Sequence, residues 1–234
     1  MLGNYVLDTI NNMKEILKKA LFDTLPVMTG YLVLGAGFGI LMSANGFSFV
    51  HSLLMSVFVY AGSLQYLGIS LLTSGVSFVS IALSSFLVNA RHLLYGISMF
   101  SKYKNTGKRK PYLVFALTDE TYSLVCNKDD KDYYLAVSLL DHIYWISGTI
   151  IGSLVSSFVS FNTEGLDFVL TALFIVIFIE QWLTSKDSFS ALSGLLFSTV
   201  CLLFFGKDRF LIPSMIMIVA SLLLKNRIKE SRNE

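Results

Sequence analysis

Residues 24–43, TLPVMTGYLVLGAGFGILMS, form a run without a single charged side chain. A run of about 20 apolar residues is long enough, as a helix, to cross a hydrocarbon core of roughly 30 Å. A surface helix of a soluble domain would carry a polar stripe at helical spacing, and this run has none. It therefore predicts a membrane-spanning helix.

The same pattern extends over the whole chain. Its 234 residues are 54% hydrophobic and 15% charged, with a mean hydropathy of +0.64, whereas an ordinary soluble domain has about 25% charged residues. The apolar segments are 24–43, 50–72, 76–100, 112–126, 133–160, 167–183, 190–206 and 209–224. The chain is therefore predicted to be all-α, a polytopic transmembrane helix bundle with six to eight membrane segments.

Three regions are expected along the chain. Residues 1–22 form an amphipathic helix, with Val6, Ile10 and Leu17 on one face, and we expect it to lie along the headgroup plane. The alternative is a soluble helical tail. No cleavable signal is expected there, because a basic tip followed by an apolar run is missing. Residues 23–224 form a single transmembrane domain, and 225–234 a basic C-terminal tail.

Several classes of function have no support in the sequence. A formal charge of +2 without a basic-aromatic module predicts no nucleic-acid partner. Cys126 and Cys201 are too sparse for a disulfide framework or a zinc site, so we expect no metal and no cofactor. There is no Gly-Lys-Ser/Thr nucleotide loop, which argues against ATP-driven pumping.

The distribution of basic residues predicts the orientation. The lysines near the N-terminus and the basic tail place both ends in the cytoplasm. Eight full crossings would put the basic loop 101–111 outside, against the positive-inside rule. If segments 50–72 and 112–126 are re-entrant or broken, six crossings remain and this loop returns to the cytoplasm.

Local chemistry supports a break in both segments. Segment 50–72 contains Ala61-Gly62-Ser63, and segment 112–126 is short and carries two acids. Non-helical backbone at membrane depth is tolerated only where protein buries it or where it lines a cavity. One interrupted segment in each half is typical of transporters built from inverted repeats, which makes such a repeat a hypothesis for this chain.

Polar residues inside apolar segments are candidates for function, because a central ionisable side chain costs about 2.5–3.5 kcal/mol on insertion scales. They form four groups: Asn89, Arg91 and His92; Thr118, Asp119 and Glu120; Asp141 and His142; and Glu180 and Gln181. Function is favoured for the first two groups, with snorkelling as the alternative for the first. Asp141 and His142 could equally form a structural pair with Arg91, and an interfacial position explains Glu180 and Gln181.

Small residues indicate close helix packing. Gly35, Gly37 and Gly39 crowd the first apolar segment, and Gly148 and Gly152 are spaced four apart in the fifth. Such spacing lets helix backbones approach closely. The same residues could act as hinges, and packing is the simpler interpretation.

Five strings occur in an order that resembles a known family. They are GAGFG at 35–39, YAGSLQ at 60–65, NARHLLYG at 89–96, LTDETY at 117–122 and GLDFVLTALF at 165–174. The set resembles the AzlC-type branched-chain amino acid permeases, the larger subunit of the LIV-E exporters. The resemblance runs from about Phe22 to the last apolar segment, although beyond Phe174 it is one of hydropathy alone.

This resemblance implies export of valine, leucine, isoleucine or a similar amino acid across the inner membrane, together with a small AzlD-type membrane partner. An aliphatic amino acid is a zwitterion, so its site needs a donor, an acceptor and an apolar wall. Arg91 can bind the carboxylate through two parallel bonds, and the other expected substrate ligands are Asn89, Gln65, Gly62 and Asp119. The expected proton-coupling residues are Glu120, His92 and Asp141.

Two other classes compete with a transporter. An intramembrane enzyme would need a nucleophile with a base or a metal cluster, yet HExxH spacing is missing and Ser63 has no assigned base. We therefore expect no catalytic residues. A channel-like or structural subunit is the other alternative, but no filter sequence or charged ring is recognisable.

Overall fold

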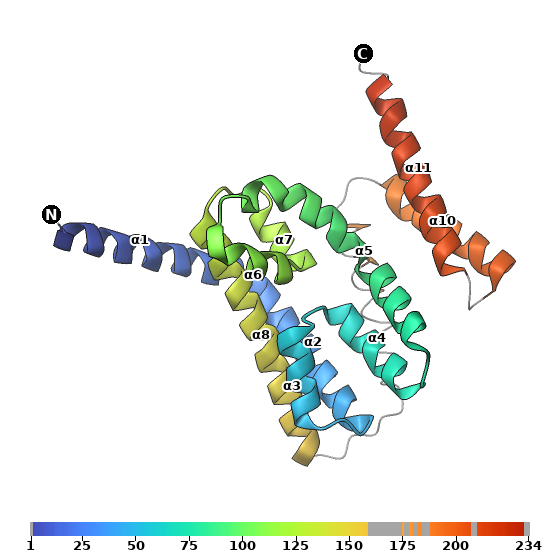
Figure 1. Cartoon of the computed structure of the whole chain (residues 1–234), viewed down its shortest axis with the longest axis horizontal. Coiled ribbons are helices and arrows are strands. Elements are labelled where there is room, and N and C mark those ends of the chain that lie inside the picture. Colours follow the sequence, from blue (N-terminus) through green and yellow to red (C-terminus); the bar gives the residue numbers. More distant parts are fainter. Residues whose placement is uncertain are drawn as a thin grey trace. The chain divides into compact units, whose positions relative to one another are not determined.

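The computed structural model describes residues 2–158, 175, 178–179, 182–183, 188–206 and 210–231. Within these residues every regular element is a helix, and the chain divides into two compact units, Met1–Leu170 and Thr171–Glu234. The first unit contains α1 (Leu2–Asp23), α2 (Leu25–Ala44), α3 (Phe49–Phe58), α4 (Gly62–Thr73), α5 (Phe78–Tyr103), the 3-10 helix η1 (Gly107–Arg109), α6 (Lys110–Phe115), α7 (Asp119–Val125) and α8 (Lys131–Phe158). The second contains α10 (Ser188–Phe205) and α11 (Leu211–Ser231) (Figure 1).

Local chain chemistry sets the helix ends. The Thr24 hydroxyl donates to the Ala20 carbonyl over 2.8 Å, and Pro26 lies in the first turn of α2, where its missing amide proton costs nothing. After α2 the chain turns at Gly46, whose φ of +82° favours glycine. At the start of α5 the backbone amide of Ser80 donates to the hydroxyl of Ser77, an N-cap.

The centre of the first unit is a close crossing of α2 and α8. A Cβ atom on Gly35 would lie 2.7 Å from the carbonyl oxygen of Trp145. Contacts advance in the same direction on both helices, since Gly39 approaches Thr149 one turn further on, so the two helices run parallel. Of the glycines named as packing or hinge residues, Gly37 faces the hydroxyl of Tyr66 on α4, whereas four lie on this crossing: Gly35, Gly39, Gly148 and Gly152. Their lack of side chains lets the backbones touch.

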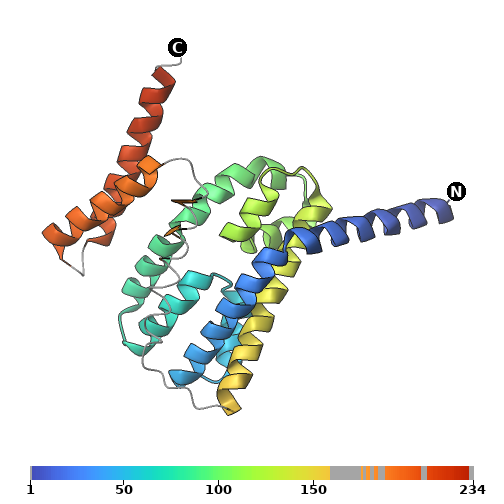
Figure 2. The same ribbon diagram turned by 180° about the vertical axis from the view of Figure 1, so that it is seen from behind.

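The segment 50–72 is divided into two helices, α3 and α4, around the interruption that the sequence indicated. Near the end of α3, the hydroxyl of Ser56 lies 2.7 Å from that of Thr149 on α8. At the start of α4, a Cβ on Gly62 would lie 3.1 Å from the ring of Trp145. Helix α3 lies beside the second half of α8, whereas α4 starts at the Trp145 ring and packs against α2 and α5 (Figures 1 and 2). The two helices form a hairpin whose tip reaches the middle of α8.

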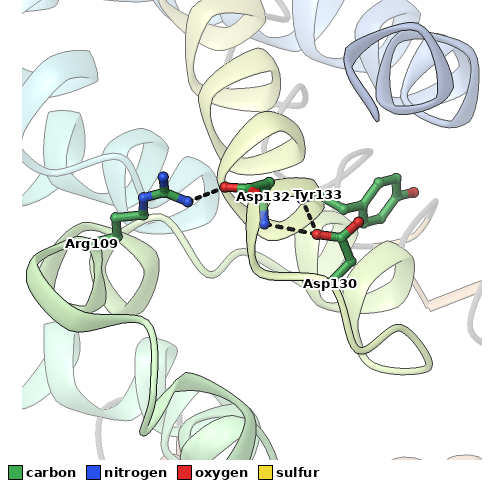
Figure 3. A network of polar contacts seen from close by, with 4 residues as sticks. All are labelled: Arg109, Asp130, Asp132 and Tyr133. Carbon is green, nitrogen blue, oxygen red and sulfur yellow. Dashed lines mark hydrogen bonds and ion pairs between the residues drawn. The ribbon is translucent and has the colours of Figure 1, made fainter. Parts of the chain in front are cut away.

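The segment 112–126 is also divided, because α6 ends at Phe115 and α7 begins at Asp119. The chain before and after it is held at one end of α8. The Lys102 ammonium lies 2.9 Å from the Asp129 carboxylate, and Arg109 pairs with Asp132 (Figure 3). The segment therefore returns to the end from which it left, and we call this end of the first unit the charged end.

Figure 3 also shows how α8 begins at the charged end. The carboxylate of Asp130 accepts hydrogen bonds from the backbone amides of Asp132 and Tyr133, at 2.9 and 3.2 Å. These amides belong to the first turn of α8, where backbone N–H groups have no carbonyl acceptor within the helix. A carboxylate there also complements the positive end of the helix dipole.

A hydrophobic cluster holds α6 and α7 against the first half of α8. It contains buried side chains of α1, α5, α6, α7 and α8 and one residue of the link between α6 and α7: Ala20, Met99, Tyr103, Leu113, Leu117, Val125, Tyr133, Tyr134 and Val137. Burial of a large apolar side chain stabilises a fold by about 1.5–3 kcal/mol. The cluster therefore fixes the short helices that could not be stable alone.

Among the described residues, three helices are long and apolar enough to cross a membrane, namely α2, α8 and α10. A fourth span results if the two parts of α5, Phe78–Ala90 and Tyr95–Tyr103, count as one, although they meet at a bend of 68°. The structure thus shows a helical protein with candidate membrane spans. The total of six to eight segments and the inverted repeat stay predictions.

The terminal regions are helical. In α1 the apolar Met13 and Leu17 are exposed, and their placement along the headgroup plane stays a prediction. The predicted basic tail, 225–234, is not separate at its start, since α11 continues through it to Ser231. Glu180 and Gln181 lie outside the described residues.

Candidate functional site

His142, in the middle part of α8, lies between the two helix breaks. Its Nε2 is 3.2 Å from the carbonyl oxygen of Ser56 in α3, and its Nδ1 is 3.2 Å from the hydroxyl of Tyr112 in α6. A carbonyl oxygen only accepts, so Nε2 carries the proton of that bond. The imidazole also stacks on Tyr60, which lies between α3 and α4. One side chain therefore links both interrupted segments to α8.

Tyr60 has an unusual backbone conformation. Its φ of 40° lies in the left-handed region, where it is the one non-glycine residue of the described chain. Such a conformation costs of order 1–3 kcal/mol and persists only where surrounding contacts impose it. Here the side chain is almost completely buried and packs against Phe115 as well as His142. Strain of this kind clusters at functional sites, which makes the break between α3 and α4 a candidate.

A chain of polar side chains links α2, α7 and α8. The Tyr31 hydroxyl donates to the Glu120 carboxylate over 2.7 Å. Its oxygen also lies 2.7 Å from the hydroxyl oxygen of Thr118. Thr118 donates to the hydroxyl of Thr121 over 3.1 Å, and Thr121 donates to the carboxylate of Asp141 over 2.7 Å. Thr118 is also the N-cap of α7, because its hydroxyl accepts from the backbone amide of Thr121. The chain connects two carboxyl groups inside the bundle.

Two buried acceptors, one on α4 and one on α8, lack partners within the described part of the protein. Gln65 is completely buried and donates to Ser56 over 3.2 Å, while its Oε1 accepts no hydrogen bond. Asp141 is also completely buried, and its Oδ1 accepts none either. An unsatisfied buried polar atom costs about 1–3 kcal/mol. Both atoms are therefore positions where a ligand group or a water molecule would be stabilised.

The start of α4 is packed directly against an aromatic wall. Gly62 faces the Trp145 ring closely enough that a side chain would have to displace it. Trp145 in turn stacks on Phe38 with ring centroids 6.5 Å apart and meets Tyr31 edge to face at 5.4 Å. The first turn of a helix presents backbone N–H groups and the positive end of the helix dipole. This arrangement places a polar helix end next to an apolar surface.

Asn89, Arg91 and His92 lie on α5, next to or within its bend. His92 Nδ1 is 3.3 Å from the carbonyl oxygen of Asn89, one turn earlier. The Arg91 side chain lies outside what the structure describes, so its predicted contacts stay predictions. Beyond the bend, Tyr95 stacks on Tyr122 of α7 at 4.5 Å, which brings α5 against the helix that carries Asp119 and Glu120.

The predicted site residues thus divide by location. Four of them lie in the connected contacts around the middle of α8: Gly62, Gln65, Glu120 and Asp141. Asp119 occupies the first turn of α7 beside them. The contacts also include residues that the sequence analysis missed: Tyr31, Tyr60, Thr121 and Trp145. Their one available signal was a hydrogen-bonding tip within or next to an apolar run.

Comparisons with known proteins find relatives over most of the chain. The family model described as AzlC protein matches residues 26–159. A Bacillus subtilis (strain 168) protein named branched-chain amino acid transport protein AzlC is 44% identical over 205 residues, which cover 85% of this chain and 81% of that protein.

Two further relatives are named as membrane proteins. An uncharacterized membrane protein of Helicobacter pylori (strain 26695) is 41% identical over 213 residues, 88% of this chain and 93% of its own length. Another, from Haemophilus influenzae, is 40% identical over 215 residues, 89% of this chain and 88% of its own length. No solved structure matches this chain.

Proposed function

Because this chain belongs to the AzlC family, we propose that it is a secondary transporter that exports valine, leucine, isoleucine or a similar amino acid across the inner membrane. The proposed export is coupled to protons and needs a small AzlD-type membrane subunit. The substrate class is supported by the name of the Bacillus subtilis relative. Export and the partner follow from the family resemblance.

The observation that carries the proposal is the meeting of two interrupted segments at the middle of α8. His142 contacts the end of α3, the strained Tyr60 and Tyr112 of α6. Interrupted helices whose ends meet near the membrane midplane form the substrate and ion sites of many secondary transporters. The α3–α4 hairpin and the α6–α7 hairpin approach from opposite ends, which also fits the inverted repeat we expected.

The proposed site binds both charges of a zwitterionic amino acid. Its carboxylate meets the first turn of α4 at Gly62 and the guanidinium of Arg91, which offers two parallel donors, with Asn89 in support. Its ammonium meets the carboxylate of Asp119. The unpartnered Oε1 of Gln65 is a further acceptor for the ammonium.

The side chain of the substrate needs an apolar wall of fixed shape. Trp145 and Phe38 are buried and stack on each other, and the Trp145 ring lies beside Gly62. A branched aliphatic side chain placed on this pair would bury apolar area at about 25 cal/mol per Å². A polar or charged side chain would lose hydration there without gaining hydrogen bonds. The wall therefore favours aliphatic amino acids.

Proton coupling is assigned to Glu120, His92 and Asp141. Glu120 and Asp141 are joined by hydroxyl groups inside the bundle, where a carboxyl group can take up and release a proton. His92 lies on α5 near the bend. Its imidazole is of the residue type that changes charge most readily near neutral pH.

The charged end of the first unit is proposed to face the cytoplasm. It contains the loop 101–111, where several lysines and Arg109 gather, and positive residues favour the cytoplasmic side. The N-terminus and the C-terminus are proposed to lie on the same side. Large apolar side chains of α5 that are exposed in the described part of the protein, such as Phe78, Phe86 and Ile97, are proposed to contact lipid or the small subunit.

Counterflow of labelled leucine into leucine-loaded proteoliposomes tests the proposed activity. We expect uptake with the chain and the small subunit together, inhibition by unlabelled valine and isoleucine, and little inhibition by aspartate or lysine. A channel would let labelled leucine equilibrate without a transient accumulation above the outside concentration. An intramembrane enzyme would give no leucine uptake. Lack of counterflow with both subunits present would reject the proposal.

A cell assay tests the direction. Cells fed branched-chain dipeptides should hold less free leucine when they express the chain, and should survive toxic leucine analogues better. If expression instead sensitises cells to the analogues, the protein is an importer. Full activity of the purified chain alone would contradict the need for a partner.

A further inference from the structure

Three hydroxyl groups join Glu120 to Asp141 without interruption. Along this hydroxyl chain the oxygen–oxygen distances are 2.7 Å from Glu120 to Tyr31, 2.7 Å from Tyr31 to Thr118, 3.1 Å from Thr118 to Thr121 and 2.7 Å from Thr121 to Asp141. All four are hydrogen-bond distances. The hydroxyl chain thus contains four contacts between five oxygen atoms.

Four such contacts need four protons, but the hydroxyl groups supply three. When both carboxylates are ionised, the three hydroxyl protons can fill only three of the four contacts, because each hydroxyl has a single proton to give. Tyr31 then donates to Glu120, Thr121 donates to Asp141, and Thr118 donates either to Tyr31 or to Thr121. One contact on either side of Thr118 is therefore left without a proton.

We propose that Glu120 and Asp141 share one proton through the hydroxyls of Tyr31, Thr118 and Thr121. With this proton on Glu120, every group in the chain donates toward Asp141, and all four contacts are satisfied. With it on Asp141, every group donates toward Glu120, and all four are satisfied again. The change from one state to the other shifts one proton across each of the four contacts, so that one carboxyl is deprotonated and the other protonated.

The surroundings favour a single shared proton over two ionised carboxylates. Thr121 and Asp141 are completely buried, and the remaining oxygen of Asp141 has no partner in the described part of the protein. An isolated buried carboxylate is costly, because nothing replaces its hydration. Glu120 is only partly buried, so the two ends of the chain differ in their access to solvent.

Other titratable groups surround the hydroxyl chain without belonging to it. They include Tyr60, His92, Tyr95, Tyr112, Asp119, Tyr122, Tyr133 and His142. Tyr60 and Tyr112 interact electrostatically with Asp141, and Tyr60 also with Glu120. None of these groups supplies one of the five oxygen atoms of the hydroxyl chain, so the count of four contacts and three hydroxyl protons is unchanged.

The use of this proton in transport rests on the proposed function. A proton that enters at the partly exposed Glu120 can reach the buried Asp141 without a charged intermediate leaving the chain. This assigns Tyr31 and Thr121 as positioning residues, since they hold the path rather than touch the substrate. The shared proton itself is a property of the resting protein and can be measured without any substrate.

Infrared spectroscopy of the full-length chain in lipid, with no amino acid present, tests the proposal. At neutral pH the wild type should show the C=O band of one protonated carboxyl group. Glu120→Gln and Asp141→Asn should each abolish it, because the new amide supplies the fourth proton and the other carboxyl stays ionised. If one substitution removes the band and the other leaves it intact, the proton belongs to one residue and is not shared.

Hydroxyl variants test the path. Tyr31→Phe should abolish the band, since it leaves two contacts that the two threonine hydroxyls satisfy without an added proton. Tyr66→Phe is the matched control: Tyr66 donates to the Leu34 carbonyl over 2.5 Å, away from the hydroxyl chain, and its variant should keep the band. Thr121→Ser retains the hydroxyl and should also keep it. A band that persists in Tyr31→Phe, or is missing in the folded wild type, overturns the proposal.

The infrared result and the transport result are separable. The expected bands together with no leucine counterflow would retain the shared proton and reject the proposed substrate. Normal counterflow, together with a band that persists in Tyr31→Phe or is missing in the wild type, would reject the shared proton and leave the proposed substrate in place.

Discussion

The imidazole ring of His142 stacks on the phenol ring of Tyr60, with ring centroids 4.2 Å apart and planes inclined by 30°. Tyr60 holds a left-handed backbone conformation, and His142 is tied to Ser56 by a hydrogen bond from Nε2. The strained turn between α3 and α4 is thereby held against α8. A substitution of either residue should therefore alter the position of the other ring.

Substitution of Tyr60 should separate the role of the ring from that of the backbone. Tyr60→Val places a β-branched residue at φ 40° and removes the ring contact, so we expect a loss of about 1–3 kcal/mol in stability. Tyr60→Phe keeps the ring and should unfold near the wild-type temperature. Thermal unfolding in lipid or detergent compares the two, and equal melting temperatures would show that the turn carries no strain.

The α2–α8 crossing predicts a sharp difference between two glycines. Gly152→Ala would drive a methyl group into the backbone of Ala36, and overpacking typically costs about 1–3 kcal/mol. Gly30→Ala is the control, because open space surrounds Gly30 on α2, and it should be neutral or slightly stabilising. Membrane accumulation and melting temperature are the measurements. Normal accumulation and melting of Gly152→Ala would refute the close crossing.

Arg91→Lys should lower leucine counterflow by about tenfold or more, although it conserves the charge. Lysine presents a point charge and cannot form the two parallel bonds of a guanidinium to a carboxylate. The control is Arg109→Lys in the exposed pair with Asp132, which should transport normally. Near-normal counterflow with lysine at position 91 would reduce Arg91 to a structural counter-charge.

Asp119 and Glu120 should differ in function although they are adjacent. Their side chains point about 100° apart on a helix, and Glu120 is the one that accepts a hydrogen bond from Tyr31. We expect Asp119→Asn to lose both exchange and pH-driven transport. Glu120→Gln should keep exchange and lose its pH dependence. If both variants transport normally across the pH range, the carboxylates have no part in the mechanism.

Single-cysteine labelling tests the two hairpins. In a variant without Cys126 and Cys201, Asn105→Cys and Asp129→Cys should react from the same side, because ion pairs hold both loops at the charged end. Ser74→Cys, in the exposed turn after α4, should react from the opposite side. We expect the charged end to be labelled only from the cytoplasm. Labelling of position 105 only from outside would overturn the orientation.

Part of the site could be predicted from the sequence, because its signals are local. The interruption Ala61-Gly62-Ser63 indicated the break between α3 and α4, and a carboxyl group in an apolar segment singled out Asp141. The partner of Asp141 could not be predicted. The sequence analysis considered Arg91, whereas the structure shows Thr121 donating to this carboxylate. A hydroxyl carries no charge and so gives no signal against an apolar background.

The sequence by itself determined that the chain is helical, apolar enough to enter a membrane, and interrupted at two points, since these properties depend on composition and on neighbouring residues. The tertiary structure alone decided that the two interruptions meet at His142, that Gly35 and Gly152 lie on one crossing, and that Glu120 and Asp141 are joined through Tyr31. These contacts connect residues more than a hundred positions apart in some cases, as Gly35 and Gly148 are. Such pairs depend on how helices pack against one another. Hydropathy does not predict this packing, because an apolar helix face is equally compatible with lipid and with another helix.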